Sequence, residues 1–540
     1  MSLPLFAELL EGLVYTPSRN GKLRLLREWF AAAPDPDRGV GLAAIAGELV
    51  LRTAKPALVR DLVAARTDPA LLALSHDFVG DFAETVALIW PEARGSNQPP
   101  PDLAEVVNVL ETAAKGELPM ILAGWLDALD ASSRFALIKL VTGGLRVGAS
   151  ARLAKTALAE WAGQDVGEIE EVWHSVAPPY LPLFRWLEGK GPRPDPDGAP
   201  VFRPLMLAHP LEEKDFAALN ASDWRAEWKW DGIRVQLTSG PGGARMWSRT
   251  GEDVSGSFPE IVEGMHFHGV LDGELLVLRD TAEGPRVVAP FADLQQRLNR
   301  KAPGPKLLRE HPAGVHLYDL LFDGEEDLRQ LSFDARRARL EAWYAANRPA
   351  RMDLSPLIPF STMAELASVR DGTRAASIEG LMLKRADSAY VPGRVKGQWW
   401  KWKRDPLSVD AVLMYAQRGH GKRSSFYSDF TFGLWRGSEG QQELVPVGKA
   451  YSGYTDEELT WIDRWIRNHT TGRFGPVREV EKQLVMEVAF DAAQYSTRHK
   501  SGVALRFPRI ARIRLDKPAS EADRLETLVA TIMPGTPVAE

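Results

Sequence analysis

Apolar residues recur at helical spacing through residues 1–190, and strand-like alternation replaces that spacing further along the chain. The helical periodicity is clearest in Leu23–Phe30, Ala57–Ala65 and Phe78–Trp90, in a region rich in Ala and Leu. No short-period repeat is present, which argues against a solenoid. The pattern predicts one irregular all-α domain over residues 1–190.

A Pro/Gly-rich stretch at residues 191–202 predicts an interdomain linker. Alternation typical of strands then dominates from Ala226 to Trp402, with helical spacing in Phe291–Leu298 and Phe333–Ala346. This mixture predicts an α+β domain over residues 203–405.

Short strand-like segments continue after that domain, with one helical segment at Asp456–Asn468 between them. The strand-like segments are Ala411–Tyr415, Phe430–Trp435, Leu444–Gly448 and Leu484–Ala489. This order predicts a small β-barrel of the oligonucleotide-binding (OB) fold over residues 406–520. Residues 521–540 are expected to form a short helix and a C-terminal tail.

The composition agrees with a soluble multidomain protein, since the 540 residues are 45% hydrophobic and 26% charged. Cysteine is absent, which excludes disulfides, thiol nucleophiles and cysteine-based zinc or iron–sulfur sites. An acidic residue follows too soon after the N-terminus for a signal peptide, and no uncharged apolar run reaches membrane-spanning length. A cytoplasmic protein is therefore expected. The net charge is −6, yet Lys384–Arg404 and Arg498–Lys517 are each strongly basic.

The segment Arg225–Leu237 carries the most distinctive motif of the chain, Lys-x-Asp-Gly-x-Arg, formed by Lys229, Asp231, Gly232 and Arg234. Alternation places Glu227, Lys229 and Asp231 on one strand face, with Trp228 and Trp230 on the other. We expect Asp-Gly to form a tight turn to a second strand, which makes the segment a β-hairpin. Lys229 is then either a nucleophile or one charge on an exposed hairpin.

A nucleophilic Lys229 needs help, because a free lysine has a pKa of about 10.4 and is almost fully protonated near neutral pH. Desolvation and nearby positive charge would have to supply roughly 4–5 kcal/mol. Lys401 and Lys403 share one face of a predicted strand, with Trp400 and Trp402 on the other. That strand is either the cationic wall that Lys229 needs or an exposed basic edge.

Carboxylates stand within apolar strand-like segments at Asp272, Glu274 and Glu379. Such groups are costly to bury unless they are paired or bind a cation, so they indicate either a magnesium site or salt bridges to nearby lysines. Tyr318 could stack on a purine base or fill the core. His266 and His268 lack an evident third ligand for zinc. No P-loop sequence is present.

Glycines surround Arg146 in the segment Phe135–Leu158, between two predicted helices. Backbone amides exposed beside a helix N-terminus suit a phosphate, whereas the alternative is a helical hairpin closed by glycine caps.

The charged motifs follow one another in a fixed order: Lys-x-Asp-Gly-x-Arg (229–234), Ser-Arg-Thr-Gly-Glu-Asp (248–253), Asp-Gly-Glu (272–274), Tyr-Asp (318–319), Glu-Gly-Leu-Met-Leu-Lys (379–384), Trp-Lys-Trp-Lys (400–403) and Arg-Phe-Pro-Arg-Ile-Ala-Arg-Ile-Arg-Leu-Asp-Lys (506–517). This order resembles that of the covalent nucleotidyltransferases, and specifically the ATP-dependent DNA ligases, over nearly the whole chain. Phe135–Leu158 resembles the DNA-binding region of three-domain ligases. The N-terminal segment at residues 15–23 is similar to the bacterial cisplatin damage response ligases.

The resemblance implies an all-α DNA-binding domain, a nucleotidyltransferase (adenylation) domain and an OB-fold domain. It implies that Lys229 takes AMP from ATP and that the AMP then passes to the 5′-phosphate of a nick. The 3′-hydroxyl finally displaces AMP and seals the backbone. The residues implied to bind ATP or AMP are Glu227, Arg234, Arg249, Glu274, Tyr318, Lys401, Lys403, Arg514 and Lys517. Arg234 and Arg249 would also contact the nick, while Arg514, Asp516 and Lys517 would orient pyrophosphate before the barrel moves to clamp DNA.

The resemblance further implies Mg²⁺, or Mn²⁺, at Glu274 and Glu379, and DNA contacts at Arg146, Gly148, Arg418, Lys422 and Arg423. It implies a monomer that acts on nicked duplex DNA at the bacterial nucleoid, without a membrane partner. The alternatives are an RNA ligase, a capping enzyme and a non-catalytic DNA-binding scaffold. The 506–517 motif argues against capping, the large helical domain against RNA ligation, and the complete set of charged residues against a scaffold.

Overall fold

The computed structural model describes residues 2–49, 51, 55–79, 81–91, 99–195, 198–281, 286–298, 300, 302–373, 377–419, 426–437, 442–497 and 499–532. The chain divides into two compact units, Met1–Asp197 and Gly198–Glu540. Across these described ranges, no helix has both the length and the apolar character needed to cross a membrane.

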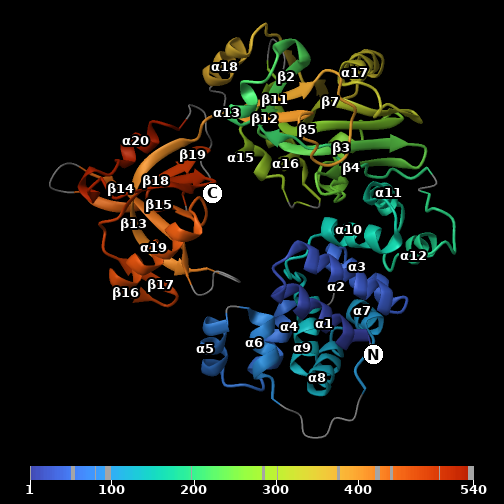
Figure 1. The fold of residues 1–540 in the computed structure, drawn as a ribbon, viewed down its shortest axis with the longest axis vertical. Helices are drawn as coiled ribbons and strands as arrows, with labels where there is room; N and C mark the ends of the chain where they lie inside the picture. Colours follow the sequence, from blue (N-terminus) through green and yellow to red (C-terminus); the bar gives the residue numbers. More distant parts are fainter. Residues whose placement is uncertain are drawn as a thin grey trace. The chain divides into compact units, whose positions relative to one another are not determined.

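The first unit is built from α-helices around one hydrophobic core (Figure 1). Its helices are α1 (Ser2–Tyr15), α2 (Arg19–Ala32), α3 (Asp37–Ala46), α4 (Pro56–Ala64), α5 (Pro69–Val79), α6 (Phe82–Ile89), α7 (Leu103–Thr112), α8 (Leu118–Ala128), α9 (Ala131–Thr142), α10 (Ala151–Ala162), α11 (Val166–Val172) and α12 (Leu181–Leu187). The prediction of a helical N-terminal region is confirmed. Leu3, Phe6, Leu137 and Phe184 are among the fully buried core residues.

The helical periodicity over Phe78–Trp90 is divided between two helices, because α5 ends at Val79 and α6 begins at Phe82. Asp81 caps α6, since its side chain accepts a hydrogen bond from the backbone N–H of Glu84 at 3.0 Å. An aspartate cap followed three residues later by glutamate is a common start signal for a helix, and it separates the two helices here.

The first part of the second unit contains two sheets that hold most of the charged motifs. One sheet has the order β1 (His209–Pro210), β12 (Trp399–Lys403), β11 (Ile378–Arg385), β2 (Trp224–Trp230), β10 (Leu357–Ile358). The other has the order β4 (Gly243–Ser248), β3 (Ile233–Gly240), β5 (Gly269–Arg279), β7 (Ala313–Asp323), β8 (Glu326–Asp327), with β6 (Val287–Val288) paired to β5 and β9 (Met352–Leu354) paired to β7. Helices in this part are α13 (Glu213–Phe216), α14 (Pro259–Val262), α15 (Phe291–Gln295), α16 (Pro305–Glu310), α17 (Phe333–Asn347) and α18 (Met363–Gly372).

The predicted β-hairpin at Arg225–Leu237 is also wrong, although both of its strands exist. β2 pairs with β11 and β10 in one sheet, whereas β3 pairs with β4 and β5 in the other. Asp231-Gly232 is therefore the point at which the chain crosses between sheets. A Cβ atom on Gly232 would lie 2.5 Å from the carbonyl oxygen of Leu275 in β5. Close approach of two backbones, rather than a hairpin turn, explains the glycine.

The last part of the chain contains a mostly antiparallel sheet with one long helix packed on it (Figure 1). Its strands run in the order β15 (Glu443–Ala450), β14 (Tyr427–Arg436), β13 (Leu407–Arg418), β17 (Val477–Val480), β16 (Thr470–Phe474); β18 (Val485–Phe490) pairs with β13 and with β21 (Arg509–Arg514), and β19 (Ala492–Tyr495) pairs with β20 (Val503–Arg506). The helix α19 spans Asp456–Asn468, as the sequence predicts, and begins with a capping box between Thr455 and Glu458. A short helix, α20 (Leu525–Val529), follows the sheet.

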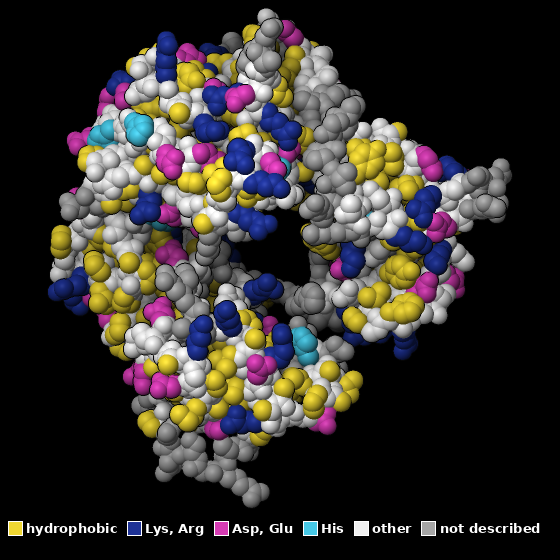
Figure 2. All heavy atoms as spheres, turned by 180° about the vertical axis from the view of Figure 1, so that it is seen from behind, with side chains coloured by type: hydrophobic (Ala, Val, Ile, Leu, Met, Phe, Trp, Pro, Cys, Tyr) yellow, Lys and Arg dark blue, Asp and Glu magenta, His cyan; other side chains and the backbone are white. Residues whose placement is uncertain are grey.

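Acidic and basic side chains intermingle over the face drawn in Figure 2. The basic motifs therefore have to be judged by their local partners.

Candidate active site

A cavity of about 510 Å³ lies where the ends of β2, β11 and β12 meet β3, β5 and β7. Its lining includes Glu227, Lys229, Asp231, Arg234, Arg249, Glu274, Tyr318, Glu379, Lys384, Lys401, Lys403 and Arg506. The fold thus brings together the nucleotide and metal residues that the sequence singled out, apart from Asp272, Arg514, Asp516 and Lys517.

Lys229 forms a 2.5 Å ion pair between its Nζ and Oε2 of Glu379, with side chains 22% and 18% exposed. Gly380 in β11 pairs with Lys229 in β2 on one side and with Lys403 in β12 on the other. The three residues therefore form a row across the sheet. The register shifts between Ile378 and Gly380, and this β-bulge carries Glu379. The bulge aims the carboxylate at the two lysines, because a bulge re-aims a side chain from its regular strand position.

A side chain at Gly380 would not fit, since its Cβ would lie 2.3 Å from the carbonyl oxygen of Trp402 and its φ is +148°. This glycine allows β11 and β12 to approach at the bulge. Behind the row, Trp400 and Trp402 pack with Trp224 and Trp228 in one hydrophobic cluster. The predicted wall of lysines backed by tryptophans is confirmed.

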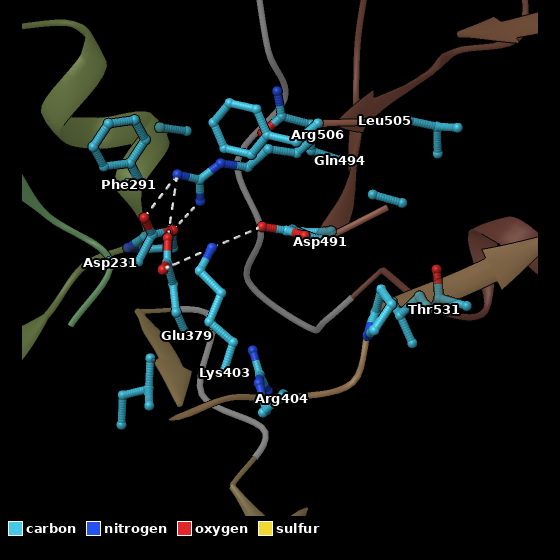
Figure 3. A pocket seen from close by; sticks show the side chains of 18 of the residues that line it. Asp231, Phe291, Glu379, Lys403, Arg404, Asp491, Gln494, Leu505, Arg506 and Thr531 are labelled. Atoms are coloured by element: carbon cyan, nitrogen blue, oxygen red, sulfur yellow. Dashed lines mark hydrogen bonds and ion pairs between the residues drawn. The ribbon is translucent and has the colours of Figure 1, made fainter. Parts of the chain in front are cut away.

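The carboxylates that flank Lys229 in sequence have other partners. Glu227 is buried and pairs with Lys384 at 2.8 Å and with Arg337 at 3.3 Å. Asp231 pairs with Arg506, whose Nη2 donates to Oδ1 at 2.7 Å and whose Nη1 donates to Oδ2 (Figure 3). Alternation along one strand revealed which charges share a face, but Lys229 receives its counter-ion from another strand.

Arg506 and Asp491 reach this site from the last part of the chain, and sequence reasoning gave neither a role. Asp491 Oδ2 lies 3.2 Å from Lys403 Nζ, and the same ammonium lies 3.2 Å from Glu379 Oε2 (Figure 3). Arg506 also packs over the ring of Phe291, with 4.6 Å from its Cζ to the ring centroid. In the sequence, Arg506 stands out as part of the basic Arg498–Lys517 stretch and of the 506–517 motif, but its partner could not be predicted because it is 275 residues away.

Cations crowd around Lys401. Burial lowers the pKa of Lys401, and the positive charges of Arg394, Lys229, Lys403 and Arg249 lower it further. Each of these charges would be relieved by an anion. The arrangement therefore suits a phosphate group beside Lys229.

The two acids proposed for a metal differ sharply in their electrostatics. Burial raises the pKa of Glu274 to about 7, only partly opposed by Lys229 and Arg234. Glu379 is desolvated too, but its lysine partners hold its pKa at about 2. Within the described ranges Glu274 takes part in no ion pair, and no group of three or more His, Asp or Glu side chains is placed to hold a metal ion. A metal here would complete its coordination with phosphate oxygens and water, which is the usual habit of Mg²⁺.

Asp272, the third acid within the apolar strand-like segments, does not line the cavity and has partners of its own. It is fully buried, and its Oδ2 accepts hydrogen bonds from Arg234 Nη2 at 2.7 Å and from the Tyr390 hydroxyl at 2.5 Å. The salt-bridge alternative applies to this residue. Arg234 also donates from Nη1 to the carbonyl of Met206 at 2.6 Å, while its buried Nε has no hydrogen-bond partner among the residues that the structure describes.

Tyr318 lines the cavity, with the ammonium of Lys384 4.4 Å and the guanidinium of Arg234 5.8 Å from its ring centroid. Burial raises the pKa of its hydroxyl. Base stacking by Tyr318 stays a prediction.

Arg514 and Lys517 do not line the cavity. Arg514 pairs with Asp516 and Asp410 at 2.8 Å each, and Lys517 pairs with Asp410 at 2.8 Å. The expected place of these two cations beside the nucleotide is therefore not seen in this arrangement.

The predicted DNA contacts are only partly described. In the first unit, Gly143 is the left-handed C-cap of α9 and Ser150 caps α10, as the glycine-cap interpretation expects, and phosphate binding by this segment stays a prediction. Arg146 between them is exposed with φ +48°, and the carbonyl of Gly148 accepts a hydrogen bond from Lys22 at 2.7 Å. Arg418 ends β13, whereas Lys422 and Arg423 lie outside the described residues.

Comparison with known proteins gives a consistent result. Residues 205–403 match the family described as "ATP dependent DNA ligase domain", and residues 423–517 match the "ATP dependent DNA ligase C terminal region". A "Probable DNA ligase" of Koribacter versatilis is 34% identical over 458 residues, covering 78% of this chain and 75% of the relative. "DNA ligase 1" of Korarchaeum cryptofilum is 31% identical, covering 81% of each chain. The solved structure of Pmar-Lig_PreS3 has a TM-score of 0.57 and 17% identity over 94% of this chain and 99% of its own, which shows a shared fold.

Proposed function

The chain belongs to the ATP-dependent DNA ligase family, and we propose that Lys229 is the residue that becomes adenylated. The observation that carries this proposal is the position of Lys229, whose ammonium contacts Glu379 inside a cavity lined by Lys401 and Lys403. The three lysines and one carboxylate come from adjacent strands of one sheet, so their spacing is rigid.

The proposed reaction has three transfers of the adenylyl or phosphate group. In the first, the Lys229 amine loses a proton to solvent and its nitrogen bonds to the α-phosphorus of ATP, while the bond to the bridging oxygen of pyrophosphate breaks. In the second, an oxygen of the 5′-phosphate at a nick bonds to the α-phosphorus, the phosphorus–nitrogen bond breaks, and the lysine nitrogen takes up a proton. In the third, the 3′-hydroxyl oxygen loses its proton to solvent and bonds to the 5′-phosphorus, while the bond from that phosphorus to the oxygen of AMP breaks and AMP leaves.

Catalysis of such transfers depends on positioning and on neutralising phosphate charge. Lys401 and Lys403 would contact the AMP phosphate, since they border Lys229 and are relieved of mutual repulsion by an anion. The ion pair between Lys229 and Glu379 would open when ATP binds, because the phosphates then compete with Glu379 for Lys229. Lys403, which also pairs with Glu379, competes with Lys229 for the carboxylate. Glu227 and Tyr318 would bound the adenine, and Arg249 would contact the nick.

Glu274 and Glu379 fit a divalent cation as a pair of oxygen ligands in the same cavity. The unpaired and desolvated Glu274 supports this, because a cation would relieve the cost of its charge. Mg²⁺ bound there would neutralise phosphate charge during the transfer, and Mn²⁺ offers the same chemistry. We further propose that the helical unit and the C-terminal sheet bind duplex DNA, with Arg146, Gly148 and Arg418 among the contacts.

The test uses ATP, GTP and NAD, each carrying its label in the transferred nucleotide, in parallel with Mg²⁺. We expect label to be transferred to the protein only from ATP, and the labelled protein then to seal nicked DNA in preference to nicked RNA duplex. Labelling from GTP would indicate capping chemistry, and preferential sealing of RNA would indicate an RNA ligase. No label from any nucleotide would leave a non-catalytic DNA-binding protein.

A further inference from the structure

One aspartate in the C-terminal part of the chain gathers the two cations that do not line the active-site cavity. Asp410 lies in β13, and its Oδ2 accepts from Arg514 Nη1 at 2.8 Å and from Lys517 Nζ at 2.8 Å. Both nitrogen atoms contact one oxygen, so they lie no further apart than twice that distance. Two cations at this spacing repel each other unless an anion stands between them.

Asp410 is itself firmly held. Its side chain is 12% exposed, its backbone N–H donates to Asp523 Oδ2 at 2.9 Å, and its carbonyl accepts from the backbone N–H of Asp523 at 2.8 Å. β13 pairs with β18, which pairs with β21, and Arg514 is the last residue of β21. The strand pairing therefore fixes both sides of the contact.

Both Asp410 and Arg514 have hydrogen-bonding atoms that the contact between them does not use. Oδ1 of Asp410 is buried without a hydrogen-bond partner in the described part of the chain. Such an unsatisfied acceptor is costly, and natural proteins keep few of them. Arg514 is shared, because its Nε and Nη2 bond Asp516 while its Nη1 bonds Asp410. Asp410 can thus keep hold of Arg514 and Lys517 when phosphate oxygens replace Asp516.

We propose that Asp410 is a positioning residue for the adenylation step, which holds Arg514 and Lys517 side by side to receive the pyrophosphate part of ATP. The inference rests on the proposed function. When the Lys229 nitrogen bonds to the α-phosphorus, the electron pair of the breaking bond stays on the bridging oxygen, and the pyrophosphate gains negative charge. The paired cations would neutralise that charge, while Asp410 keeps them next to each other. Asp410 itself neither contacts ATP nor accepts a proton.

The test is the reverse reaction, in which pyrophosphate discharges AMP from labelled full-length enzyme. We expect Asp410→Asn to raise the apparent KM for pyrophosphate by roughly 10- to 100-fold, because a misplaced binding group loses contact with its ligand. Sealing of a pre-adenylated nick, which involves no pyrophosphate, should change by less than about twofold. Asp463→Asn is the matched control, since Asp463 is 11% exposed, lies in the same part of the chain and pairs with Arg467 at 2.7 Å.

A double-mutant cycle keeps the test decisive if Asp410→Asn is also less stable. Combining it with Lys517→Ala should cost less than the sum of the two single losses, because Asp410 acts in part through that cation. Additive losses, an unchanged KM for pyrophosphate, or an equal loss in sealing would each overturn the inference. Failure of the proposed function would look different, since the unaltered enzyme would then take up no label from ATP.

Discussion

Glu274 should reduce the stability of the ligand-free enzyme at neutral pH, so that Glu274→Gln is more stable but inactive. Burial raises the pKa of Glu274 from 4.5 to about 7. Between these values the folded protein keeps a proton that the unfolded chain has lost, so the free energy of unfolding falls as pH rises. At about 1.36 kcal/mol per pKa unit, the decline amounts to about 3 kcal/mol. Glutamine has no titratable group, so Glu274→Gln does not show this decline in the free energy of unfolding.

The expected result is a stability difference that depends on pH. Near pH 4 the variant and the unaltered enzyme should be equally stable, and near pH 8 the variant should be more stable by about 3 kcal/mol. In a domain of 150–250 residues this is roughly 6–12 °C in the thermal midpoint, which differential scanning calorimetry resolves. Burial lowers the pKa of His316 to about 4, which makes stability rise with pH over part of the same range. That contribution is present in both proteins and cancels in the difference.

Glu263→Gln serves as the control, because Glu263 is an exposed carboxylate in the same part of the chain. It should give no pH-dependent difference. Saturating Mg²⁺ and ATP should stabilise the unaltered enzyme more than Glu274→Gln, which lacks one of the two proposed metal ligands. The reasoning fails if Glu274→Gln is less stable than the unaltered enzyme at pH 8, or if its advantage is the same at pH 4 and pH 8.

Three further substitutions test other parts of the account. Arg506→Ala leaves Asp231 buried without its partner, which should lower the free energy of unfolding by about 3–5 kcal/mol. Arg509→Ala, at a more exposed arginine, should cost little. Equal thermal midpoints for the two variants would contradict this expectation. Arg514→Ala should slow self-adenylation far more than the sealing of pre-adenylated nicks, and equal losses in the two assays would refute a role confined to the first step. Gly232→Ala would bring a Cβ within 2.5 Å of a β5 backbone oxygen, so we expect a large fall in the thermal midpoint and in label uptake, and normal values of both would show that the close approach is unimportant.

The sequence predicted local structure well where one pattern decides it. Alternation identified the strands on either side of Asp231-Gly232, and helical periodicity gave the bounds of α19 at Asp456–Asn468. Strand pairing is a different matter, because alternation assigns residues to faces but names no partner. The hairpin prediction failed for that reason, since β2 and β3 each pair with strands far away in sequence.

The candidate site shows the same division. Motif order brought Lys229, Glu274, Glu379, Lys401 and Lys403 together correctly, and the comparisons confirm the ligase family. The individual ion pairs could not be predicted, because a bulge at Glu379 decides which carboxylate meets Lys229. The contacts made by Arg506, Asp491 and Asp410 connect segments that are far apart in sequence, so no local pattern of residues could predict them.

The most direct test of the central claim is transfer of α-labelled ATP to the protein, followed by identification of the labelled residue. We expect label on Lys229 through a phosphoramidate bond, which is acid-labile, and no label on Lys229→Ala. Lys403→Ala should be labelled more slowly at that same residue. Labelling of Lys229→Ala, or label found on any other residue of the unaltered enzyme, would contradict the account.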